Sequence, residues 1–151
     1  MGRPLMLAVL ALLPLLARGE GYFCALVMAT GFMYIDGVWR EQTLKAEQKF
    51  IVRPSNSRDE WDHALQYPSN PLHLKWVVLP VGGSTGIAFC PDSFDAEGGL
   101  ICASRIADFR LNKNTLHFLY TYLFGYWNST PSDEAADTPF VAIGKCSLMK
   151  P

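Results

Sequence analysis

The sequence is poor in the residues from which enzyme and metal sites are usually built, with three histidines and four cysteines among 151 residues. The cysteines do not form the close ligand pairs of a zinc site or the Cys-x-x-Cys of a redox dithiol. The chain also lacks G-x-x-x-x-G-K-[ST], a strand-linked G-x-G-x-x-G and G-x-S-x-G. These absences exclude the nucleotide-binding and hydrolase classes that the motifs define. We therefore assign no catalytic, cofactor-binding or metal-binding residue and expect no cofactor.

Charge is also sparse: charged residues make up 18% of the chain, and the formal net charge is −1. Lys and Arg are interspersed with Asp and Glu, so no basic patch is available for a phosphate backbone. We expect no nucleic-acid partner.

Long apolar runs are absent except near the start, where Leu5 to Leu16 is interrupted only by Pro14. Arg3 precedes this run, and the small residues Ala17 and Gly19 follow it, which is the pattern of a signal peptide. A membrane-spanning helix needs about 20 apolar residues, and this run is shorter. We expect residues 1–19 to be cleaved, with cleavage after Gly21 as the alternative.

Removal of residues 1–19 leaves 132 residues, 20–151, with 11 basic and 14 acidic side chains and a formal charge of −3. That length suits one domain. The export signal places the mature protein in the periplasm or outside the cell, with no stable membrane span after cleavage.

Four cysteines in an exported chain predict two disulfides, for which three pairings exist. Cys90 and Cys102 flank a segment rich in turn formers, so they can lie on neighbouring antiparallel strands. We pair Cys24 with Cys146, which would tie the first mature strand to the last. In the chain-entropy model the short loop stabilises by about 3 kcal/mol and the long one by about 5 kcal/mol.

Short runs of apolar, β-branched and aromatic residues alternate with clusters of Gly, Pro, Asn, Asp and Ser, which predicts an all-β chain. We expect an antiparallel meander that forms a small closed or partly open barrel, with a β-sandwich as the alternative. Residues 55–71 are predicted to be a long loop with a helical turn at 57–65, where Ser57 would cap and Glu60 would complete a capping box. The predicted strands are residues 22–28, 31–35, 43–47, 49–54, 74–81, 86–90, 99–104, 107–112, 115–127 and 139–146.

The strongest local pattern covers residues 107–127, in which Asn112, Lys113 and Asn114 divide the two runs of a predicted hairpin. The two-residue period of strands places a row of mostly aromatic side chains on one face of the second run, and His117 on the other. Such a row is ordinarily core, and the alternative is the wall of a ligand site. The candidate wall consists of Phe118, Tyr120, Tyr122, Phe124 and Tyr126, with Leu116 at its start.

These patterns favour a non-enzymatic binding or interaction module that takes a small apolar ligand or a protein partner. The competing class is a small cell-envelope hydrolase. It would use His63, His73 or His117 with serine and carboxylate partners brought together by the fold.

The back half of the chain carries G-L-x-C at residues 99–102, F-R-x-N at 109–112, Y-x-x-G-Y-W at 122–127 and D-T-P-F-x-x-I-G-K-C-S at 137–147. With the Phe23-Cys24 pair in the front half, this pattern resembles small exported hypothetical proteins of alphaproteobacteria. The resemblance implies bacterial export. Because that family has no assigned activity, the resemblance supplies no catalytic residue.

A looser likeness is to small periplasmic lysozyme-inhibitor barrels, which open on an F-x-C strand and close on a terminal cysteine. Phe23 lies directly beside Cys24 here, so the F-x-C spacing is not met. The Ser-Gly-x-x-Tyr loop of those inhibitors is also absent. Lysozyme inhibition is therefore an analogy of fold.

Overall fold

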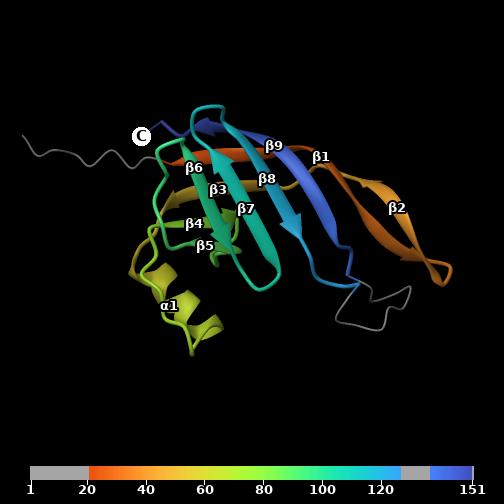
Figure 1. Ribbon diagram of the computed structural model, residues 1–151, viewed down its shortest axis with the longest axis horizontal. Coiled ribbons are helices and arrows are strands. Elements are labelled where there is room, and N and C mark those ends of the chain that lie inside the picture. The colour runs from red at the N-terminus through yellow and green to blue at the C-terminus, as the bar shows by residue number, and fades with distance from the viewer. Residues whose placement is uncertain (1–20, 127–136, 151) are drawn as a thin grey trace, which may run out of the picture.

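The strands of this protein follow one another around a barrel, as the computed structural model shows for residues 21–126 and 137–150 (Figure 1). The predicted signal peptide, residues 1–19, lies outside the described residues. The elements are β1 (Tyr22–Ile35), β2 (Val38–Leu44), β3 (Lys49–Pro54), α1 (Ser57–Gln66), β4 (Trp76–Pro80), β5 (Ala88–Cys90), β6 (Gly99–Ala103), β7 (Ala107–Asn112), β8 (His117–Tyr122) and β9 (Phe140–Leu148).

Neighbouring strands pair antiparallel in the order β2-β1-β3-β4-β5-β6-β7-β8-β9, and β1 also pairs with β9. The β1–β9 pairing closes a barrel of eight strands and leaves β2 as an extra strand outside it. This confirms the all-β antiparallel meander and shows a closed barrel in place of the alternative sandwich.

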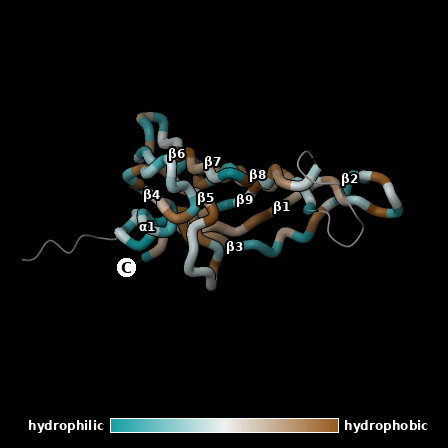
Figure 2. Tube along the Cα trace, turned by 90° about the horizontal axis from the view of Figure 1, so that it is seen from below, coloured by the Kyte–Doolittle hydropathy of each residue, from teal (hydrophilic) through white to brown (hydrophobic). Residues whose placement is uncertain are grey.

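The β1–β2 hairpin extends away from the barrel (Figures 1 and 2). We predicted two strands, 22–28 and 31–35, but β1 is continuous through an irregularity between Leu26 and Met28. The hairpin turn is Asp36-Gly37, with positive φ angles of 53° and 81°, the conformation that Asp-Gly favours in two-residue hairpin loops. The prediction for residues 43–47 reached only the end of β2, because its polar residues lack the alternation of a half-buried strand.

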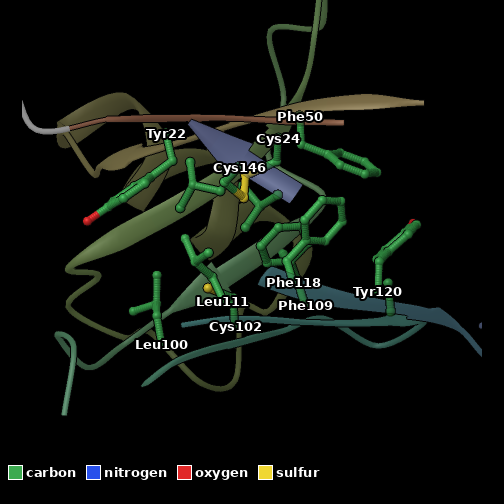
Figure 3. Packing of buried hydrophobic residues seen from close by; sticks show 14 of the residues in the cluster. Tyr22, Cys24, Phe50, Leu100, Cys102, Phe109, Leu111, Phe118, Tyr120 and Cys146 are labelled. Carbon is green, nitrogen blue, oxygen red and sulfur yellow. A yellow bond between two sulfur atoms is a disulfide. The ribbon is translucent and has the colours of Figure 1, made fainter. Parts of the chain in front are cut away.

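The barrel interior is filled by aromatic rings (Figure 3). Phe109 and Phe118 stack with ring centroids 4.9 Å apart, and Phe50 meets them edge-on at 5.7 and 6.0 Å. Gly144 of β9 leaves room for this stack, since a Cβ there would collide with the Phe118 ring and the backbone oxygen of Ala25. The middle of the barrel is therefore core and holds no ligand space.

Both predicted disulfides are present, and each joins neighbouring strands of the barrel wall. Cys24–Cys146 links register partners on β1 and β9, where the first and last strands meet. Cys90–Cys102 links β5 to β6, a pair of strands with a single register pair, Phe89 with Ala103. The two bridges thus fasten the closing pair and the most weakly paired neighbours of the wall.

Residues 57–66 form a full helix, α1, rather than one turn within a loop. Our capping assignment was wrong by one residue: the N-cap is Asn56, whose side chain accepts from the N–H groups of Arg58 and Asp59. Asp59 completes the capping box and is buried, with its carboxylate held by both terminal nitrogens of Arg53 at 2.7 and 2.9 Å. This bidentate pair, a strong form of ion pair, fixes the start of α1 to β3.

Candidate binding site at the barrel mouth

One end of the barrel is hollow, and its opening lies where β6 and β8 end and where β5 and β7 begin. The cavity there has a volume of about 670 Å³. A neighbouring hollow of about 420 Å³ shares Ile87 and Tyr120 with it. The larger cavity, called the mouth from here on, is lined by Gln66, Tyr67, Gly86, Ile87, Ser104, Arg105, Ile106, Ala107, Tyr120, Tyr122 and Phe124.

The opposite end of the barrel is closed by aromatic side chains. Phe94, on the loop after β5, lies 5.6 Å from the Tyr22 ring and 5.1 Å from the Trp76 ring. With this end covered and the middle filled, a ligand would reach the barrel through the mouth.

Hydrogen bonds that involve backbone N–H groups hold the turn between β6 and β7 against the rest of the mouth. Ser104 organises the turn, because its hydroxyl oxygen accepts from the N–H of Ala107 at 3.0 Å. The Tyr67 hydroxyl accepts from the N–H of Arg105 at 2.8 Å, and the carbonyl of Ile106 accepts from the N–H of Leu123 at 2.9 Å. Side chains from three distant stretches of sequence are therefore fixed around one opening.

The predicted aromatic row divides between the core and the mouth. Phe118 is core, whereas Tyr120 has its ring in the core cluster and also lines the mouth. Tyr122 and Phe124 line the mouth, although β8 ends at Tyr122. Tyr126 is exposed, and its ring lies 5.4 Å from that of Trp39 on β2. The core interpretation thus holds for Phe118 and Tyr120, and Tyr120, Tyr122 and Phe124 line a cavity.

Tyr122 stays uncharged at physiological pH. Burial raises the pKa of its hydroxyl, and the carboxylate of Asp137, which shares a hydrogen bond with it, raises it further. Burial likewise raises the pKa of Tyr120, with Tyr122 as a further cause. The deep wall of the mouth therefore presents neutral phenols rather than charges.

The polar groups of the mouth lie at its rim, where Gln66, Ser104 and Arg105 join the lining. Arg105 is exposed. Apolar walls with a few polar groups at the edge are the usual composition of small-molecule sites. This arrangement suits a compact apolar ligand that carries a polar group at its outer end.

Sequence reasoning missed more than half of the mouth. Half of the missed residues come from segments assigned to loops or turns, and the others lie at the ends of predicted strands. Tyr67 belongs to the supposed long loop, and Arg105 and Ile106 lie in a turn of two predicted strands.

The three histidines are far from forming a triad. His117 is exposed on the outer face of β8, and His73 is exposed with Nδ1 3.5 Å from Oε1 of Glu60. His63 lies on the buried face of α1, between the rings of Tyr67 and Phe89. Its ring centroid is 4.7 Å from that of Tyr67 and 4.9 Å from that of Phe89. His63 and His73 do not line the mouth or the hollow next to it. His117 lines two depressions of the outer wall, one of them together with Asp95, and among the described residues no serine lines either depression.

We expect His63 to make the folded protein less stable in acid. Desolvation lowers its pKa, and its Nδ1 is buried without a hydrogen-bond partner among the described residues. The unfolded chain takes up this proton as the pH falls below about 6.5, whereas the folded protein does so only below the lowered pKa. Between these two values the unfolded state binds more protons, so the free energy of unfolding falls with decreasing pH, by about 1.4 kcal/mol per unit of difference.

We expect His63→Phe, which keeps a ring against Tyr67, to abolish this slope in urea unfolding measured from pH 7.5 to 5. The exposed His73→Gln should leave it unchanged. An identical slope in His63→Phe and the native protein would contradict this assignment.

Among residues 21–126 and 137–150, no three side chains of His, Cys, Asp or Glu gather into a metal site. In the same part of the chain, no helix has the length and apolar character needed to cross a bilayer.

Fold and site together define a closed, disulfide-bonded antiparallel barrel with a solid middle and an apolar cavity at one mouth. Comparison of the chain with protein-family models, curated proteins and solved structures finds no match.

Proposed function

We propose that this is an exported, non-enzymatic binding protein of the periplasm or the cell exterior that holds a small apolar ligand in the mouth of its barrel. The observation that carries the proposal is the mouth itself: a cavity of about 670 Å³ with aromatic and aliphatic walls at the open end of a filled barrel. Cavities of about 300–1,000 Å³ are the size that small-molecule sites occupy.

The disulfides support the placement outside the cytoplasm, where such bonds persist. The predicted signal peptide, residues 1–19, points to the same compartments.

Binding of the neutral apolar dye N-phenyl-1-naphthylamine to the purified, disulfide-bonded protein tests the proposal, because the dye fluoresces in apolar surroundings. We expect saturable binding with one site per chain. Ile106→Glu should weaken it about tenfold or more, because it places a charge in the apolar wall.

Leu72→Glu is the matched control, because Leu72 and Ile106 are equally exposed, at 37% each, and Leu72 does not line the mouth. Equal dye affinity in the two variants, or unsaturable binding, would overturn the proposed site. Thermal unfolding of both variants confirms that each is folded.

A further inference from the structure

The outer face of β1, β9 and β8 carries large apolar side chains in the open. Met28, Phe32 and Leu123 are 53–59% exposed, and Leu119, Val141 and Ile143 are 37–49% exposed. Strand register places Met28, Ile143 and Leu119 side by side in one row across the three strands. Contiguous exposed apolar surface of this kind marks an interaction site. We call these six residues the outer patch.

The charges beside the outer patch are ordered by the same register. The row of Ile143 and Leu119 continues to Arg110 on β7, and the adjacent row of Val141 and Thr121 continues to Asp108. Arg110 and Asp108 lie two residues apart on one strand, so both project from the same outer face. Neither has an ion pair among the described residues.

This order makes the face complementary to itself. Consider a two-fold axis that lies in the plane of the interface, runs perpendicular to the strands and passes between the two rows. Rotation about this axis reverses the strand direction and places each row opposite the other row of a second copy. Ile143 then meets Val141 of the second copy. Arg110 meets Asp108 of the second copy, and the symmetry repeats each contact.

The shape of this outer face is also compatible with the two-fold rotation. A depression of about 240 Å³ lies beside the outer patch on the β1, β9 and β8 strands, lined by Val27, His117, Phe118, Ile143, Gly144 and Lys145. β8 begins at His117, which lines the depression, and Leu123 follows its last residue. Because the rotation reverses the strand direction, Leu123 of the second copy lies near the depression.

We propose that the outer patch is the interface of a symmetric dimer of this chain, with Arg110 paired to Asp108 across the two-fold axis. The interface lies on the outside of the barrel wall, and none of the six residues of the outer patch lines the mouth.

Multi-angle light scattering during size-exclusion chromatography tests the dimer with the disulfide-bonded protein. We expect twice the chain mass at tens of micromolar and the single-chain mass for Ile143→Asp. Leu65→Asp, on the exposed side of α1 and outside the outer patch, should remain a dimer. A native protein that stays monomeric up to about 1 mM would overturn the proposal, since a dissociation constant above that concentration corresponds to an association free energy weaker than about 4 kcal/mol.

A charge exchange tests the pairing without removing apolar surface. Arg110→Asp and Asp108→Arg should each raise the dimer dissociation constant about tenfold or more, because each variant places like charges opposite each other. The double variant should restore the native constant to within about threefold, by the logic of double-mutant cycles. A double variant no better than the single ones would overturn the pairing.

Vesicles of phosphatidylethanolamine and phosphatidylglycerol separate the dimer from a lipid-facing role. We expect the dimer to remain in solution. A monomer that floats with the vesicles and is released by Ile143→Asp would assign the outer patch to lipid and overturn the dimer.

Discussion

Replacing Cys24 and Cys146 together by alanine should lower the free energy of unfolding by about 5 kcal/mol in the chain-entropy model, because the bridge closes a loop spanning most of the chain. The bond links residues 122 positions apart. It also joins the two strands whose pairing closes the barrel. A small domain has about 5–15 kcal/mol of total stability, so the variant should be close to unfolding at 37 °C. Urea unfolding followed by fluorescence measures the loss.

The second disulfide is the matched control for loop length. Cys90 and Cys102 are 12 residues apart, so alanine at both should cost about 3 kcal/mol. All four cysteines are buried, which makes the two double variants comparable in the volume they remove. A larger loss from the Cys90/Cys102 variant would show that strain or packing outweighs chain entropy at these bridges.

Phe50→Ala should cost about 3–5 kcal/mol, the range of large-to-small substitutions at buried phenylalanines. The Phe50 ring is almost completely buried and lies within 5.0–6.0 Å of the rings of Phe109, Phe118 and Tyr120. Its removal leaves a cavity, and a closed barrel wall cannot readily relax to fill it. Chemical denaturation, with the slope compared between variants, measures the effect.

Phe23→Ala is the matched control, because Phe23 lies on the neighbouring strand, one position from Cys24, with its side chain on the outer face. We expect a loss of about 1 kcal/mol or less there. Similar losses for Phe50→Ala and Phe23→Ala would mean that the barrel interior is not the main core.

Much of the wall could be predicted from the sequence because each strand has a buried face with its own short-range pattern. The alternation in residues 107–112 and 115–127 predicted both strands of the β7–β8 hairpin, although β8 spans only His117–Tyr122. The turn formers between Cys90 and Cys102 were enough to predict their bridge. These features depend on residues close together in the chain, so the sequence pattern is enough to predict them.

The missed parts depend on contacts between distant residues. The helix α1 is held by Arg53 and by Phe89, on which His63 and Tyr67 pack. Neither Arg53 nor Phe89 lies in a window over residues 55–71. The mouth likewise joins Tyr67 to Arg105 across 38 positions. The cap was misassigned for a local reason, since Asn56 and Ser57 are both good N-cap residues and only the backbone geometry chooses between them.

A filled interior changes where a ligand can be held by this barrel. Phe109, Phe118 and Phe50 occupy the space that a larger barrel would leave for cargo, as expected when eight strands give an interior just wide enough for side chains. The aromatic row that begins on β8 leaves the core at Tyr120 and enters the lining of the mouth at Tyr122 and Phe124.

Native mass spectrometry of the protein isolated from the compartment to which it is exported tests the central claim, that the mouth holds a small apolar molecule. We predict one such molecule bound per chain in the native protein, retained in Leu72→Glu and lost from Ile106→Glu. A native protein that carries no bound molecule, or a molecule retained equally by Ile106→Glu, would contradict the account.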